Sequence, residues 1–324
     1  MSGPMVELQG LSRNFGKTVA VADVSFTVPE GSAVGFIGPN GAGTSTTLKM
    51  LATILRPSRG DAVIDGRSLT RDRAAIRRLI GYMPDVCGLY EEMMVHEYLR
   101  FFAAVYGIRG NDAEKAVTES LDLTGLDTKA DALCGNLSRG MSQRLHLARV
   151  LLHDPKVLLL DEPAAGLDPR ARVEFKELVV ALRRLGKTLL ISSHILSELA
   201  AMCDEVAIIE KGALVYSGPI RGVGVGANGG ADEGRVFQVR ALAEPEAGRS
   251  FGDLSETVRS FEYVDAVREG DERETLLVRF RAGYADVHRL CAELIGRGYK
   301  VERFAEEQVG LEEAFIRMTK GLVS

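Results

Sequence analysis

The feature that most constrains the fold is a glycine-rich loop between a short apolar run and a helical pattern. Residues 38–46 read Gly-Pro-Asn-Gly-Ala-Gly-Thr-Ser-Thr. They match the phosphate-loop pattern G-x-x-x-x-G-K-[ST], except that Thr44 replaces the lysine. The glycines allow backbone N–H groups to turn around an anion, and a helix that begins near Ser45 adds its positive end. The sequence therefore predicts a strand, a phosphate-binding loop and a helix, without the ammonium group of the lysine.

Short apolar runs alternate with helical patterns over the first two hundred or so residues, which is typical of an α/β domain with a parallel sheet. Buried central strands are expected as continuous apolar runs at residues 33–37, 157–160 and 188–191. Residues 24–28 alternate like a half-exposed strand, and residues 206–209 and 213–217 read as a hairpin. Helices are predicted at residues 46–52, 94–106, 112–124, 142–153 and 170–185.

A glycine-rich segment separates two predicted folding units. We expect one domain at residues 1–220, a linker at 221–234 and a smaller α+β domain at 235–324. The order βαββαβ is predicted for the smaller domain, with elements at residues 235–242, 254–260, 263–267, 275–280, 285–297 and 299–304. A final amphipathic helix at residues 311–318 is expected to pack on either domain.

Charge and composition exclude several classes of protein. The chain has a formal net charge of -5 and a pI of about 5.7, which argues against a partner that is a nucleic acid. No run approaches the roughly 18 apolar residues of a membrane helix, so we expect any membrane contact to go through a partner. The four cysteines form no metal-binding or redox pair, which suggests a reducing cytoplasm; they are Cys87, Cys134, Cys203 and Cys291.

Two carboxylates follow a predicted buried strand. Asp161 and Glu162 come directly after residues 157–160, and ligands bind at the carboxyl ends of parallel strands. A carboxylate at this edge suits magnesium, and the second carboxylate is expected beside it. Three further motifs surround the pair in sequence: residues 137–144 (Leu-Ser-Arg-Gly-Met-Ser-Gln-Arg), 165–168 (Ala-Gly-Leu-Asp) and 192–194 (Ser-Ser-His).

This ordered set of motifs resembles the nucleotide-binding subunits of ABC (ATP-binding cassette) transporters over about residues 5 to 218. Residues 137–144 look like the family signature LSGGQ, with Arg139 and Met141 as departures. Residues 80–85 look like the approach to the Q-loop, with Asp85 where glutamine is usual. Residues 311–315 (Leu-Glu-Glu-Ala-Phe) are similar to the C-terminal extension of subunits that serve ABC-2-type exporters.

The resemblance implies a P-loop NTPase fold, an ABC cassette with a parallel-sheet core, an antiparallel β subdomain and a helical subdomain. It also implies two ligands, ATP and Mg²⁺. Magnesium is expected at Ser45, Asp85 and Asp161, and the catalytic residues are expected to be Glu162 as general base and His194 at the γ phosphate. Residues implied in nucleotide binding are Phe15 under the adenine, then Gly38, Asn40, Gly41, Ala42, Gly43, Thr44, Ser45 and Thr46 around the phosphates, and Ser138, Gly140, Gln143 and Asp168. In this family Ser138 and Gly140 are expected to complete the site of the opposite subunit.

Simpler interpretations stay open for four of these residues. An aromatic residue before Gly16 is also compatible with a core position for Phe15. Asp85 also fits a solvated loop acid, Glu162 taken alone fits a helix cap, and His194 fits an ordinary loop histidine.

The resemblance implies an ATP-hydrolysing subunit that powers export through a separate membrane-spanning ABC-2-type permease. We expect a cytoplasmic protein, peripheral on the inner face of the cell membrane, that pairs with a second cassette as a homodimer or heterodimer and contacts the permease through residues 87–93. Thr44 favours one alternative, a cassette that binds ATP with little or no hydrolysis. A second alternative is a soluble ABC-type regulator, although the acidic charge balance speaks against a nucleic-acid target.

Overall fold

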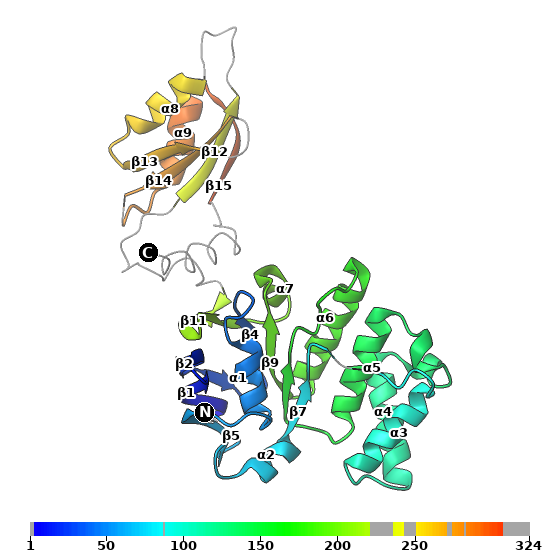
Figure 1. Ribbon diagram of the computed structural model, residues 1–324. Helices are drawn as coiled ribbons and strands as arrows, with labels where there is room; N and C mark the ends of the chain where they lie inside the picture. The colour runs from blue at the N-terminus through cyan, green and yellow to red at the C-terminus, as the bar shows by residue number, and fades with distance from the viewer. Residues whose placement is uncertain are drawn as a thin grey trace. The chain divides into compact units, whose positions relative to one another are not determined.

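The structure is a computed structural model that describes residues 3–86, 88–220, 236–242, 251–270, 274–281 and 283–306. The described residues fall into two compact units, one within residues 3–220 and the other within residues 236–306 (Figure 1). The predicted linker at 221–234 and the predicted final helix at 311–318 lie outside the described residues.

A six-stranded sheet forms the centre of the first unit, in the order β11-β10-β4-β9-β8-β7. Its pairs are parallel except for the β10–β11 hairpin. The strands are β4 (Ala33–Ile37), β7 (Ile80–Met83), β8 (Val157–Leu160), β9 (Thr188–Ser193), β10 (Glu205–Glu210) and β11 (Ala213–Pro219). Every residue of β4, β8 and β9 is buried, which confirms the three predicted central strands.

A second sheet is antiparallel and has the order β2-β1-β5-β6, with β3 also paired to β1. Its strands are β1 (Pro4–Phe15), β2 (Thr18–Val24), β3 (Thr27–Pro29), β5 (Arg59–Ile64) and β6 (Arg67–Ser68). The prediction of one strand at residues 24–28 was wrong, because β2 ends at Val24 and β3 begins at Thr27. Between them the Ser25 hydroxyl accepts a hydrogen bond from the N–H of Gly10, whose φ is +60° and which lies at a register shift of the partner strand β1.

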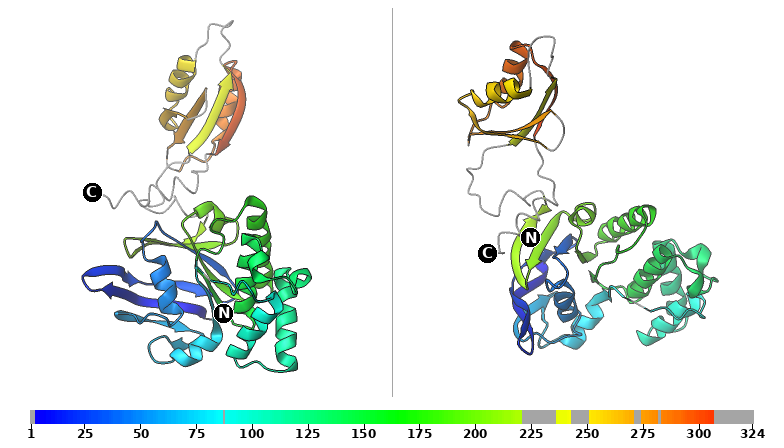
Figure 2. Two further views of the ribbon diagram at one scale, coloured as in Figure 1. Left: turned by 45° about the vertical axis from the view of Figure 1, so that its right-hand side comes forward. Right: turned by 45° about the horizontal axis from the view of Figure 1, so that its top comes forward.

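The first unit contains the helices α1 (Thr44–Leu51), α2 (Arg73–Leu79), α3 (Val95–Val105), α4 (Asn111–Thr124), α5 (Arg139–Leu151), α6 (Pro169–Arg184) and α7 (Leu196–Ala200). All five predicted helices are present, although α1 begins two residues and α5 three residues before the predicted start. Helices α3, α4 and α5 pack together around a core of their own that includes Tyr98, Leu121 and Leu145 (Figure 2). None of the helices in the described residues is long and apolar enough to cross a membrane.

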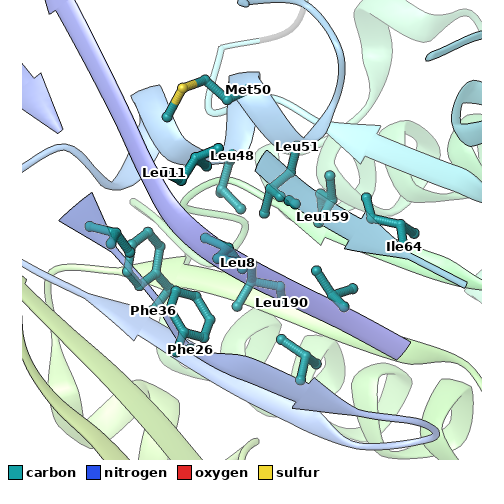
Figure 3. Packing of buried hydrophobic residues seen from close by; sticks show 14 of the residues in the cluster. Leu8, Leu11, Phe26, Phe36, Leu48, Met50, Leu51, Ile64, Leu159 and Leu190 are labelled. Atoms are coloured by element: carbon teal, nitrogen blue, oxygen red, sulfur yellow. The ribbon is translucent and has the colours of Figure 1, made fainter. Parts of the chain in front are cut away.

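The main core lies where α1 and the antiparallel sheet pack against the parallel sheet. Leu8 and Ile64 from the antiparallel sheet pack in one cluster with Leu48 of α1 and with Leu159 and Leu190 of the central strands (Figure 3). These side chains are 0–2% exposed. Helix α1, which carries the last three residues of the predicted phosphate site, 44–46, is therefore fixed by core packing on its inner face.

The second unit has the predicted order βαββαβ. Its elements are β12 (Val236–Leu242), α8 (Phe251–Arg259), β13 (Val264–Glu269), β14 (Thr275–Phe280), α9 (His288–Gly296) and β15 (Lys300–Glu306). The strands form an antiparallel sheet in the order β13-β14-β12-β15. Apolar residues of both helices, such as Leu254 and Leu290, form one core with Val239 and Val278 of the sheet. The α+β prediction for this part of the chain is confirmed.

Candidate nucleotide site

The glycine-rich loop connects the buried strand β4 to helix α1 in a space that excludes larger side chains. A Cβ atom at Gly38 would lie 2.5 Å from the carbonyl oxygen of Ile209. A Cβ at Gly43 would lie 2.5 Å from the carbonyl oxygen of Ala20, and Gly43 also has a φ of +109°. The N–H of Ala42 bonds the carbonyl of Pro39 at 2.9 Å, which closes a tight turn. The loop thus has the compact turn that a backbone phosphate cradle requires.

Helix α1 begins at Thr44, so the first helical residue is the one that replaces the lysine. No side chain caps this helix end. The first turn, which includes Ser45 and Thr46, therefore presents backbone N–H groups that no preceding helical carbonyl satisfies. Together with the helix dipole these donors fit a phosphate group.

Asp161 is the centre of the hydrogen-bond network at the end of β8. Its carboxylate is 1% exposed, and its Oδ1 atom accepts hydrogen bonds from the hydroxyls of Ser45 at 3.0 Å and Ser192 at 2.8 Å. The Tyr82 hydroxyl donates to Oδ2 at 3.3 Å. Burial, with the neighbouring Asp161 charge, raises the pKa of Tyr82, so the phenol keeps the proton that it donates. The fold therefore brings the loop and the acidic pair together, as the sequence predicts.

The oxygen atoms of Ser45 and Asp161 fit magnesium. Magnesium prefers oxygen ligands and is commonly held by one or two carboxylates together with substrate phosphates. Within the described residues no group of three or more His, Cys, Asp or Glu side chains gathers into a metal cluster. The donor set thus suits an ion that is shared with a nucleotide better than one enclosed by protein alone.

Glu162 follows Asp161 in an unusual backbone conformation. Its φ is +49°, a left-handed value that costs a non-glycine residue about 1–3 kcal/mol, and its N–H donates to the Ser192 hydroxyl at 3.0 Å. Its Oε2 atom lies 3.0 Å from Nδ1 of His194. Because an ionised carboxylate can only accept, Nδ1 carries the proton of this hydrogen bond.

The pKa of Glu162 is raised. Burial of the carboxylate is the largest cause, the hydrogen bond and charge of His194 oppose it, and the charges of Asp161 and Asp85 add to it. A more basic carboxylate is a better proton acceptor. Asp85 itself is exposed and lies two residues after the end of β7.

The signature residues lie at the start of α5. Ser138 caps this helix by accepting a hydrogen bond from the N–H of Met141 at 3.3 Å. A Cβ at Gly140 would lie 2.9 Å from the Cβ of Ala171, so Gly140 allows α5 to approach α6. The predicted start of α5 at residue 142 was wrong because the serine already supplies the N-cap.

Asp168 and Gln143 are the two remaining predicted nucleotide-binding residues near the signature. Asp168 caps α6 by accepting a hydrogen bond from the N–H of Ala171 at 2.9 Å, and Gln143 is buried within α5. Among the described residues, no hydrogen bond or ion pair joins Ser138 or Gly140 to the phosphate loop. The structure of one chain therefore brings together the loop and the acidic pair but not the signature.

Phe15 ends strand β1 and is 45% exposed, so it is not a core residue. The guanidinium of Arg13 lies 4.6 Å from the centre of its ring. An exposed aromatic ring beside a cation is a suitable surface for a nucleobase.

Sequence reasoning missed the roles of Tyr82, Ser192 and Arg13. Tyr82 and Ser192 stand inside recognised motifs, at the ends of strands that flank β8. Their position on neighbouring strands was the available signal, since carboxyl ends of parallel strands meet at one edge. No comparable pattern marks Arg13.

Comparison with known proteins gives a consistent result. The family description "ABC transporter" matches residues 21–165. The chain is 37% identical over 221 residues to the ABC transporter ATP-binding protein NatA of Bacillus subtilis. The aligned region covers 67% of this chain and 90% of that protein. It is 39% identical over 219 residues to the Nod factor export ATP-binding protein I of Bradyrhizobium diazoefficiens, with 67% and 71% covered.

A solved structure described as the ATP-binding subunit of an ABC transporter superposes with a TM-score of 0.61 at 31% identity, covering 70% of this chain and 95% of the other. These matches confirm the P-loop ATPase fold that the sequence predicts. The relatives share with this chain a region of about the length of its first unit. The chain therefore belongs to the ATP-binding proteins of ABC transporters.

Proposed function

We propose that this chain binds ATP with magnesium and hydrolyses it to power export through a separate membrane-spanning ABC-2-type permease. The observation that carries the proposal is the pair of contacts at the end of β8. Ser45 bonds Asp161, and the adjacent Glu162 bonds His194 at 3.0 Å. If the glycine-rich loop served only to connect β4 to α1, the neighbouring end of β8 would not require a half-buried glutamate that is hydrogen-bonded to a histidine.

In this proposal backbone N–H groups of the loop at residues 38–46 bind phosphate oxygens, and Ser45 and Asp161 would hold the metal ion. Magnesium, when bound, neutralises charge on the phosphates. Glu162 takes a proton from the water that attacks the γ phosphorus, while the bond from that phosphorus to the bridging oxygen breaks and ADP leaves. His194 holds Glu162 through the Nδ1 hydrogen bond and contacts the γ phosphate with its other ring nitrogen, Nε2.

A second cassette is part of the proposal. In the described residues Ser138 and Gly140 have no bond to the phosphate loop of their own chain, which fits a role in the site of the opposite subunit. Asp168 and Gln143 belong to the same region. Asp85 remains a proposed magnesium contact.

A cassette with little hydrolysis is the second candidate, and Thr44 favours it. A unit charge about 4 Å from another at an effective dielectric near 20 is worth roughly 4 kcal/mol, or up to about three decades in rate. A threonine side chain is too short and carries no charge. We therefore expect weaker ATP binding and slower turnover than a site with lysine.

The proposed contact with the permease is the predicted loop at residues 87–93, together with exposed residues next to it and on α3. Tyr90 is 54% exposed and packs edge-on against Phe101, which is 45% exposed. Val86 and Val105 are also exposed. Aromatic and apolar side chains of this kind are enriched at protein interfaces. Such a contact would hold the chain at the inner face of the cell membrane, on the cytoplasmic side.

The experiment that tests the proposed function is phosphate release from ATP by the purified protein with and without magnesium. We expect slow, magnesium-dependent release that Glu162→Gln abolishes, since an amide cannot accept the proton of water. The glutamine keeps the size of the side chain, so ATP binding should persist. Release that is unchanged in Glu162→Gln would contradict the proposal.

A further inference from the structure

Arg139 replaces the first glycine of the signature and is an exposed cation at the start of α5. Its guanidinium lies directly over Gly166. A Cβ atom at Gly166 would be 2.5–2.6 Å from the Cζ and both Nη atoms of Arg139, and Gly166 has a φ of +67°. A side chain at position 166 would therefore displace the guanidinium. Gly166 therefore leaves room for the Arg139 guanidinium to pack against the loop that follows Glu162.

No acidic partner neutralises this cation in the part of the chain that the structure describes. The ion pairs of the neighbouring arginines go elsewhere: Arg144 and Arg170 to Glu174, and Arg172 to Glu198. Arg139 thus presents an uncompensated charge between Ser138 and Gly140. An arginine in this situation suits phosphate, because its planar fork stays protonated and donates two parallel hydrogen bonds.

The phosphate loop, in contrast, lacks a positive charge. Thr44 stands where a lysine would place a charge. The hydrogen bonds to Asp161 come from Ser45, Ser192 and Tyr82, all of them neutral hydroxyls. In the described residues the network at this carboxylate therefore contains no cationic donor.

We propose that Arg139 of one subunit supplies the positive charge that Thr44 cannot supply to the phosphate site of a second copy of this chain. The inference rests on the proposed function, in particular on the pairing that brings Ser138 of one subunit to the phosphate loop of the other. Arg139 then binds a terminal phosphate oxygen and stabilises the charge that develops on the transferring group. In this arrangement the positive charge at the phosphate site comes from the signature of the partner chain and not from the phosphate loop itself.

The test is a cycle of four proteins: wild type, Thr44→Lys, Arg139→Gln and the double variant. We expect Arg139→Gln to lower single-turnover hydrolysis about tenfold or more in the wild-type background. In the Thr44→Lys background, the same change should lower the rate less than about threefold, because the introduced lysine then provides the charge. Arg139→Lys should keep part of the activity. Arg184→Gln, an equal loss of charge at the far end of α6, is the matched control and should leave the rate unchanged.

A second measurement does not depend on hydrolysis. In the Glu162→Gln background, ATP-dependent dimer formation is followed by light scattering, and ATP affinity is measured at concentrations at which the protein is monomeric. Arg139→Gln should weaken the ATP-dependent dimer and leave the affinity of the monomer unchanged. Thr44→Lys should restore the dimer.

Two results would overturn the inference. One is an equal loss of rate and of dimer from Arg139→Gln in both backgrounds, and the other is an absence of any ATP-dependent dimer. Failure of the proposed function is distinguishable, since it appears as hydrolysis that is missing in the wild type or unaffected by Glu162→Gln. In the case of missing hydrolysis, the dimer measurement still decides the role of Arg139.

Discussion

The Asp161 carboxylate combines nearly complete burial with neutral hydrogen-bond donors. Two serine hydroxyls and one tyrosine hydroxyl hold it, so its negative charge is solvated by dipoles and not by a cation. A buried ion that is not paired favours the binding of an opposite charge. This arrangement supports the proposed magnesium site, even though Thr44 leaves the loop without a lysine.

Thr44→Lys is expected to raise the single-turnover rate of ATP hydrolysis, because it restores a unit charge near the γ phosphate. The gain should be smaller than the roughly three decades of an uncompensated charge, since the proposed contact of Arg139 from the second copy already supplies part of it. ATP affinity should increase in parallel. The measurement is rapid-quench hydrolysis with protein in excess of nucleotide. Thr118→Lys adds the same charge on the exposed face of α4 and serves as the control. An equal rate in wild type and Thr44→Lys would show that the missing lysine is not the limiting feature.

Individual site residues were predictable where a motif fixed their place in the sequence. Ser45, Asp161, Glu162 and His194 stand in such motifs, and the structure brings them together. The partners that hold them were not predictable in the same way. Ser192 reaches Asp161 only because β9 pairs with β8, and that pairing depends on the whole sheet.

At the scale of elements, the secondary-structure predictions succeeded where the sequence shows one clear periodicity. They failed where contacts with a neighbouring element determine the structure. The buried strands β4 and β8 are continuous apolar runs and were recognised. Strand β7 has only four residues, and its Gly81 is required because a Cβ there would overlap the side chain of Val150 on α5. A contact of this kind between distant residues leaves no local signal.

The carboxylate of Asp61, on β5, holds residues 68–70 against this strand. Asp61 accepts hydrogen bonds from the Ser68 hydroxyl and from the N–H groups of Ala62 and Thr70. Burial alone would raise the pKa of Asp61, but these hydrogen bonds outweigh it and lower the pKa below the usual value. The folded protein therefore favours the charged form of Asp61.

Asp61→Asn should lower the free energy of unfolding by about 1 kcal/mol at pH 7, a modest value because Asp61 is partly exposed. A lowered pKa gives stability that is present above the pKa of the unfolded chain, about 3.9, and is lost as the pH falls through the lower folded value. The difference between wild type and Asp61→Asn should therefore shrink below about pH 4. Urea unfolding followed by circular dichroism at several pH values measures it. Asp112→Asn, in the first turn of α4, is the control. A difference that does not change with pH would contradict the assignment.

At the scale of the whole molecule, the site and its supporting contacts lie within the first unit. The described residues that hold it, from Phe15 on β1 to His194 after β9, have the partners named above between residues 3 and 220. The second unit has its own core, in which both helices pack against the sheet. Among the described residues, the apolar clusters of the first unit and the cluster of the second unit have no residue in common.

Because each unit has a separate core, a chain that ends at residue 220 should fold and should hydrolyse ATP within about threefold of the full chain, a change of less than about 0.7 kcal/mol in the activation free energy. Folding is checked by thermal unfolding, and activity by magnesium-dependent phosphate release at equal protein concentrations. The same truncation that carries Glu162→Gln gives the inactive control. A truncated chain that is folded but more than tenfold slower would show that residues beyond 220 act on the ATPase site, and the second unit would then be a regulator of hydrolysis.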